Sequence, residues 1–106
     1  MAGSSGSSRP NIPILDDSNY ERWYTEMTVL LEFHDLYDIV IEGYRPLGPH
    51  PTDAEKEDYR EAKRKDAEAL LLIHQSVNSA YFQKIASATS AKAAWRILDN
   101  PLNGQS

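Results

Sequence analysis

Apolar residues recur every three to four positions along most of the chain, which is the period of helices that bury one side. The first apolar stripe consists of Tyr20, Trp23, Tyr24, Met27, Leu30 and Leu31. Ser18 precedes this stripe and Glu21 follows three positions later, a pattern typical of a capping box at a helix N-terminus. We therefore predict a helix from about residue 19 to residue 34.

The next segment, residues 36–41, is ambiguous. Its β-branched run Ile39-Val40-Ile41 favours a strand by residue preference. No second strand candidate is available for pairing, and a lone strand leaves its backbone hydrogen bonds unmade. We expect a short helix instead, packed on the first one and ended by Gly43. Residues 9–15 contain two prolines and are expected to be extended.

Residues 44–51 contain three prolines and a glycine, which predicts a loop. Thr52 and Glu55 then form a second capping-box pattern, and the helix that they open could continue to about Val77. Such a helix would be roughly 39 Å long, which is more than a small core needs. Its first half is nearly all charged, so we expect only its second half to enter the core.

Two further helices are predicted near the C-terminus. Asn78 with Ser79 can cap the first of them, and Thr89 with Ser90 can cap the second. The pair Asn100-Pro101 is expected to end the last helix. The fold class is therefore all-α, a compact bundle of about five helices. Its predicted core consists of Tyr20, Trp23, Met27, Leu30, Leu31, Leu70, Ile73, Val77, Ile85, Trp95 and Leu98.

The length of 106 residues suits one domain. Residues 1–8 are Gly- and Ser-rich and are interpreted as a disordered leader left by protein expression. We expect residues 9–100 to form a single helical lobe and residues 101–106 to be a frayed C-terminus. The hydrophobic fraction of 41% is high enough for a folded core.

The composition narrows the classes of function. There is no Cys, which excludes disulfides, Cys-based zinc sites and thiol nucleophiles. The longest apolar run, residues 69–73, is far short of a membrane span, and no signal peptide is visible, so we expect a cytoplasmic protein without membrane contact. The net charge is −5, and residues 11–43 carry eight acids against one base. Such a surface repels phosphates, which disfavours nucleic-acid binding.

Candidate catalytic and metal groups have simpler interpretations. The run Asp16-Asp17-Ser18 lacks the glycine-bearing loop of an aspartic protease, and helix capping explains it better. No two of the three histidines are three or four positions apart, so no metal-binding pair is evident. The basic run Lys63-Arg64-Lys65 is flanked by acids, which indicates a solvated helix face. We predict no enzyme activity, no cofactor and no metal.

Aromatic and aliphatic residues outside the stripes are candidates for binding. Trp23 and Trp95 could stack on bases, but both lie centrally in apolar stripes, which favours core packing. Four other residues flank the helices at positions where no stripe requires them. They are predicted to be exposed and to form an interaction surface, and they are Ile12, Ile14, Tyr37 and Tyr44.

Two segments resemble, in order and spacing, the Gag polypeptide of copia-type LTR retrotransposons. The first contains Leu15, Asn19-Tyr20, Trp23, Met27, Leu30-Leu31 and Leu36-Tyr37-Asp38-Ile39-Val40. The second contains Lys65-Asp66-Ala67, the run from Leu70 to Ile73, Ile85-Ala86, Thr89, Ala91-Lys92, Ala94-Trp95 and Leu98. Tyr37 stands where the family usually has Trp. The resemblance implies an α-helical lobe like that of a retroviral capsid, in a protein that assembles into particles packaging RNA.

The resemblance leaves two hypotheses about function. The first is a structural one, in which the chain is the N-terminal capsid lobe of such a Gag protein and binds other Gag subunits to form virus-like particles. The second is a domesticated lobe that binds a short peptide of a partner protein. In the family, RNA binding usually lies in a Cys/His zinc knuckle or a basic tail, and neither is present here, so RNA contact is expected only through regions outside this chain.

Overall fold

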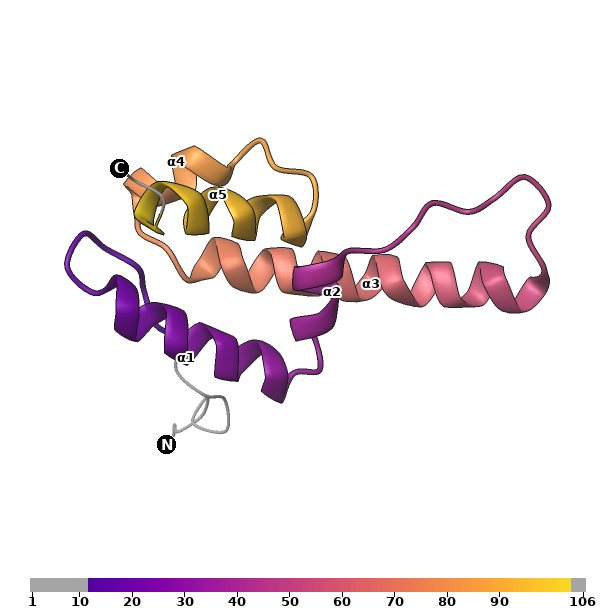
Figure 1. The fold of residues 1–106 in the computed structure, drawn as a ribbon, viewed down its shortest axis with the longest axis horizontal. Helices are drawn as coiled ribbons and strands as arrows, with labels where there is room; N and C mark the ends of the chain where they lie inside the picture. The colour runs from indigo at the N-terminus through magenta and orange to yellow at the C-terminus, as the bar shows by residue number, and fades with distance from the viewer. Residues whose placement is uncertain (1–11, 104–106) are drawn as a thin grey trace, which may run out of the picture.

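The computed structural model describes residues 12–103, with side chains up to Asp99. Five helices follow one another in Figure 1: α1 (Tyr20–Phe33), α2 (Tyr37–Glu42), α3 (Asp53–Gln75), α4 (Ser79–Ile85) and α5 (Ala91–Asn103). They confirm the predicted all-α bundle, including the helix chosen over a strand at Ile39-Val40-Ile41. The only β-type pairing in the described range is an isolated parallel bridge between Leu15 and Val77. The predicted leader, residues 1–8, lies outside the described residues.

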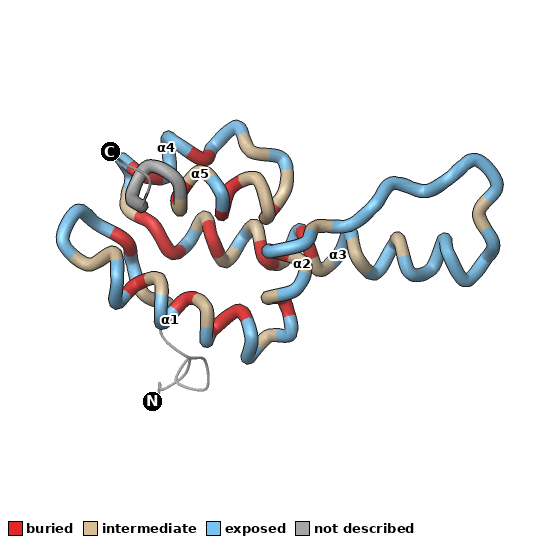
Figure 2. The backbone as a smooth tube through the Cα atoms, viewed as in Figure 1, coloured by how far each residue is buried: buried red, intermediate tan, exposed pale blue. Residues whose placement is uncertain are grey.

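The helices surround one core, and α3 is longer than that core. α5 packs against α2, α3 and α4, whereas α1 and α4 lie on opposite sides of α3 (Figure 1). The first half of α3 extends away from the other helices, and the loop of residues 44–52 runs back beside it. We call this loop and residues 53–64 of α3 the arm. Figure 2 shows that the arm is mostly exposed and has no buried position, while the buried positions gather in the body.

Most of the predicted core residues are buried. Those that are buried are Trp23, Met27, Leu30, Leu31, Ile73, Val77, Ile85, Trp95 and Leu98. Tyr20 and Leu70 are only partly buried and pack against the edge of the core. The structure adds residues that no stripe had indicated, above all Leu15, Leu36 and Val40, which are almost completely inaccessible.

The segment before α1 is attached to the corner between α3 and α4. The Leu15 backbone N–H donates to the Ser76 carbonyl at 2.7 Å, and the Asn78 N–H donates to the Leu15 carbonyl at 3.1 Å. The Trp23 indole Nε1 also donates to the Ser76 carbonyl, at 2.8 Å. Ser76 is fully buried, and its hydroxyl donates to the Ile73 carbonyl at 2.8 Å. One carbonyl thus holds both the N-terminal segment and α1 against the end of α3.

The predicted capping box at the start of α1 is wrong. The N-cap position is Asn19, and its side chain makes no capping hydrogen bond to the helix. The Ser18 hydroxyl donates instead to the Asp16 carboxylate at 2.8 Å. The Asn19 amide turns back to donate to the Ile14 carbonyl at 2.8 Å. These polar side chains shape the turn before the helix, because Asx-type bonds compete with capping.

The other capping predictions are confirmed. At α3, Thr52 Oγ1 accepts from the Glu55 N–H at 3.0 Å, and the Glu55 carboxylate accepts from the Thr52 N–H at 2.9 Å. At α4, Asn78 Oδ1 accepts from the Tyr81 N–H at 3.0 Å. Each cap satisfies a donor that has no partner within its helix.

The predicted end of α5 is too early. The helix continues through Asn100-Pro101 to Asn103, so residues 101–103 are helical and not a frayed terminus. Proline fixes φ near the helical value, and the helix continues past Pro101 without the N–H that this residue would otherwise donate. Residues 104–106 of the predicted terminus lie outside the described residues.

A buried carboxylate holds the start of α5. The Asp66 side chain, in the middle of α3, accepts from the Ala91 N–H at 2.9 Å, and the residue is only 5% exposed. Ser90 provides the second cap, because its hydroxyl accepts from the Ala93 N–H at 3.1 Å. A negative charge at a helix N-terminus is also favoured by the helix dipole.

We expect Asp66→Ala to lower the free energy of unfolding by roughly 1–3 kcal/mol, because it leaves a buried N–H without a partner. Asp66→Asn keeps an acceptor and should lose less. The control is Asp58→Ala on the exposed arm, which should stay within about 0.5 kcal/mol of wild type. Urea unfolding followed by circular dichroism measures all three, and equal losses for Asp66→Ala and Asp58→Ala would contradict the role of Asp66.

Candidate interaction surfaces

The four residues of the predicted interaction surface do not form one surface. Ile14 is 48% exposed beside the start of α1, whereas Tyr44 is exposed in the arm, where its ring contacts that of Tyr59. Ile12 and Tyr37 are partly buried and pack against the core. Ile12 is close to the docked Leu15, and Tyr37 begins a helix that lies against α3 and α5. The prediction that Ile12 and Tyr37 are exposed is therefore wrong.

A larger apolar surface lies on the outer side of α1. Phe33 is 71% exposed and Val29 is 59% exposed, and these two residues are one helical turn apart. Together with Pro13 and Leu30 they line a hollow of about 640 Å³, with Arg22 and Glu26 at its polar end. We call this the α1 outer face. Its signal in the sequence was the spacing of four between Val29 and Phe33, on the side opposite to the stripe.

A second apolar surface lies where α3 meets α4. Leu71 on α3 is 55% exposed, and Phe82 on α4 is 38% exposed. His74 stands one turn after Leu71, and its ring contacts Phe82 edge to face, with centroids 5.1 Å apart. The His74 Nε2 atom is buried and has no hydrogen-bond partner among residues 12–103. We call Leu71, His74 and Phe82 the α3–α4 face.

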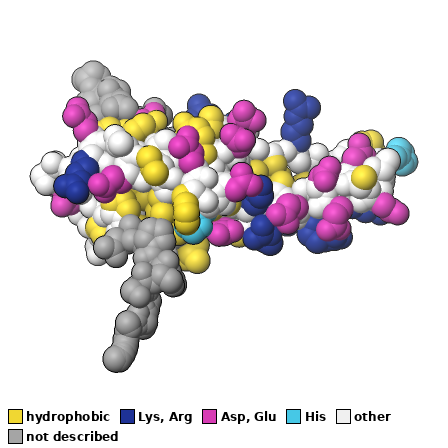
Figure 3. All heavy atoms as spheres, turned by 90° about the horizontal axis from the view of Figure 1, so that it is seen from below, with side chains coloured by type: hydrophobic (Ala, Val, Ile, Leu, Met, Phe, Trp, Pro, Cys, Tyr) yellow, Lys and Arg dark blue, Asp and Glu magenta, His cyan; other side chains and the backbone are white. Residues whose placement is uncertain are grey.

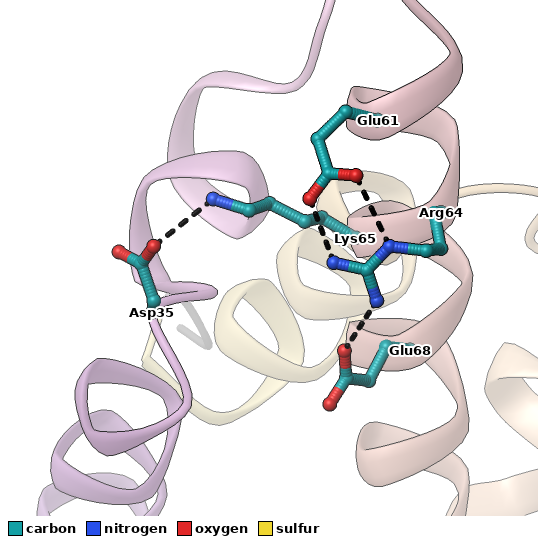
Figure 4. A network of polar contacts seen from close by, with 5 residues as sticks. All are labelled: Asp35, Glu61, Arg64, Lys65 and Glu68. Carbon is teal, nitrogen blue, oxygen red and sulfur yellow. Dashed lines mark hydrogen bonds and ion pairs between the residues drawn. The ribbon is translucent and has the colours of Figure 1, made fainter.

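The basic run of α3 is neutralised by its neighbours (Figure 4). The Arg64 guanidinium contacts Glu61 at 2.7 Å and Glu68 at 3.3 Å, and Lys65 reaches the Asp35 carboxylate at 3.0 Å. The hydrogen bond from Arg64 lowers the pKa of Glu61. Lys63 lies over the Tyr59 ring, 5.7 Å from its centroid. These contacts leave little unpaired positive charge for a phosphate backbone.

The view from below in Figure 3 separates two kinds of surface. Hydrophobic side chains gather on the body, and charges of both signs alternate along the arm. Within residues 12–103, no group of three or more His, Cys, Asp or Glu side chains is placed to hold a metal ion. None of the helices in this range has the length and apolar character needed to cross a membrane.

Searches against protein-family models, curated proteins and solved structures give no match for this chain. The resemblance to copia-type Gag therefore rests on the two segments of the sequence alone, and it remains a prediction. What can be argued about function comes from the two apolar faces and the arm.

Proposed function

We propose that this chain is an assembly lobe of a capsid-like structural protein, of the copia-type Gag kind, whose partner is another copy of the same protein. The ordered sequence motifs and the all-α bundle support this proposal. The observation that carries it is the presence of two separate apolar faces. The α1 outer face lies on α1, whereas the α3–α4 face lies where α3 meets α4 (Figure 1).

Two faces on one subunit are what an extended assembly requires. A single self-complementary patch closes a two-fold dimer, whereas contacts between two different patches can continue from one subunit to the next. Each face presents only two or three large apolar side chains. Interfaces below about 1,200 Å² are individually weak, so a shell would gain its stability from many repeated contacts. The isolated lobe should then be a monomer or a weak dimer at micromolar concentration.

A charge introduced on either face should weaken self-association, because an unpaired carboxylate would be desolvated in the contact. We expect Phe33→Asp on the α1 outer face and Leu71→Asp on the α3–α4 face each to shift association to at least about tenfold higher concentration. Sedimentation velocity across a concentration series measures this shift. Electron microscopy of the chain at high concentration, or of a longer chain that contains it, tests for particles.

The control for this experiment is Ser87→Asp, which adds the same charge at an exposed position outside both faces. All three variants should melt near the wild-type temperature, since the substituted side chains are exposed. Particles that form equally well from the Phe33→Asp, Leu71→Asp double variant would contradict the proposal that these faces mediate assembly.

A second candidate function is a peptide-binding module. It is favoured by the hollow on the α1 outer face, which is large enough to accept apolar side chains of an extended peptide. The two functions differ in one measurement. A binding module would remain monomeric at millimolar concentration and would show saturable shifts of α1 amide signals on titration with a peptide library, whereas an assembly lobe would self-associate without a peptide.

A further inference from the structure

The arm carries a short exposed segment between Tyr44 and the start of α3. It has the sequence Arg45-Pro46-Leu47-Gly48-Pro49-His50, and all six residues are exposed. No hydrogen bond within the described part of the chain involves the backbone of this segment, and it contains no helix or strand. A Cβ atom built on Gly48 would meet nothing within 4 Å. Loops of folded domains usually pack some of their side chains, so this exposure requires an explanation.

The residue order of the segment favours an extended backbone, and the structure adds a bend at Pro49 and His50. Pro46 and Pro49 have φ fixed near −65° by their rings. Arg45, Gly48 and His50 each precede a proline, which biases them toward the β and polyproline II regions. Leu47 is the only residue of the six without such a restriction. A polyproline II helix has three residues per turn, so Pro46 and Pro49 project from the same edge.

Both ends of the segment are fixed to the protein. On one side, Tyr44 contacts the Tyr59 ring of α3 with centroids 5.6 Å apart. On the other side, Thr52 and Glu55 form the capping box of α3. Between these anchors the loop stands away from the helix, and a groove of about 550 Å³ separates them. The segment is thus held at its ends and open along its length, which reduces the entropy lost when a partner orders it.

We propose that residues 45–50 are a ligand presented to a separate protein, a domain that binds polyproline II segments in an aromatic-lined groove. Such domains take the two prolines of a Pro-x-x-Pro segment side by side on their aromatic rings. The partner also carries a carboxylate cluster at one end of its groove. We infer this carboxylate cluster from Arg45, because its exposed guanidinium has no ion pair within residues 12–103 and is available to a partner. This binding activity goes beyond assembly and uses neither apolar face.

The test uses the full chain and a panel of purified recombinant domains of the SH3, WW and EVH1 classes. Each domain is titrated into the isotopically labelled chain, and amide shifts are followed by nuclear magnetic resonance. We expect at least one domain to bind with a micromolar constant and to shift the signals of residues 44–51 alone. The Pro46→Ala, Pro49→Ala double variant should bind at least about tenfold more weakly.

Charge is tested by a matched pair of variants. Arg45→Ala should weaken binding several-fold, whereas Lys56→Ala, which removes an exposed cation of α3, should leave it unchanged. All variants should retain the wild-type helical spectrum and melting temperature, because the substituted side chains are exposed. Absence of binding by every domain at millimolar concentration would overturn the proposal, as would undiminished binding by the double-proline variant. Amide shifts centred on Tyr59 and Ala62 that persist in the double-proline variant would show that the partner binds in the groove between the loop and α3. This result would also overturn the proposal.

Discussion

Truncation of Trp23 to Ala should unfold the domain or come close to it. Trp23 is 1% exposed, and its ring packs on that of Trp95 with centroids 5.4 Å apart. Its indole N–H also donates a hydrogen bond to the buried Ser76 carbonyl. Removal of a buried aromatic side chain costs about 3–5 kcal/mol, and a domain of this kind has a total stability of about 5–15 kcal/mol. Thermal and urea unfolding, followed by far-ultraviolet circular dichroism, measure the loss.

Two control variants separate the contributions of Trp23. Trp23→Phe keeps a ring in the core but loses the hydrogen bond to Ser76, so it should cost less than Trp23→Ala. Phe33→Ala removes an aromatic residue of α1 that is 71% exposed, and it should change stability by less than about 0.5 kcal/mol. If Trp23→Ala melts like wild type, the packing of α1 described above is wrong and Trp23 becomes available again as a stacking surface.

The second large effect should come from Leu15, which lies outside every helix. Its side chain is fully buried and its backbone pairs with the corner between α3 and α4. We expect Leu15→Ala to cost about 2–5 kcal/mol, the range for a buried Leu whose cavity cannot collapse. The neighbouring Ile14 is 48% exposed, so Ile14→Ala is a matched control with a small effect.

Urea unfolding distinguishes the two neighbours. A lower midpoint with an unchanged m-value for Leu15→Ala would show a loss of stability in the same cooperative unit. Equal and small losses for Leu15→Ala and Ile14→Ala would mean that the N-terminal segment is not part of the folded core. A biphasic transition would indicate that the segment detaches before the helices unfold.

The helices could be predicted because their signals are local. Thr52 with Glu55 and the cap at Asn78 lie within one turn of the helices they open, and the stripes of α1 and α3 repeat within each helix. Local signals also misled, both at Pro101, through which α5 continues, and at the start of α1. Ser18 and Glu21 fit a capping box, but the Asp16 carboxylate takes the Ser18 hydroxyl. The capping-box pattern depends only on the spacing of Ser18 and Glu21. It does not take into account a third residue, here Asp16, that competes for the Ser18 hydroxyl.

Contacts between distant segments could not be predicted in the same way. Leu15 and Leu36 lie beside turns and outside every helical stripe, so no periodicity marks them as buried. Their burial depends on where the chain returns, at Ser76 for Leu15. Asp66 had no visible role for the same reason, because its partner Ala91 lies on another helix.

The surfaces were predicted least well. The absence of a stripe around Ile12 and Tyr37 suggested exposure, yet both pack against the core. Phe33 and Val29 were the better candidates, since they lie off the buried side of an otherwise amphipathic helix. The exposure of the first half of α3 did follow from the sequence, because a nearly all-charged helical segment has no apolar side to bury.

The Ser76 carbonyl that receives both Leu15 and Trp23 has a consequence for how the protein is made. Trp23 and Ser76 are 53 positions apart, so at about 5–20 residues per second the ribosome needs roughly 3–11 s between them. During that interval the end of α3, whose Ser76 carbonyl accepts the Trp23 hydrogen bond, has not yet been made. The apolar stripe of α1 is then exposed to other proteins in the cell. Chaperones that shield nascent chains would therefore meet this domain through α1, and would release it once the end of α3 had emerged.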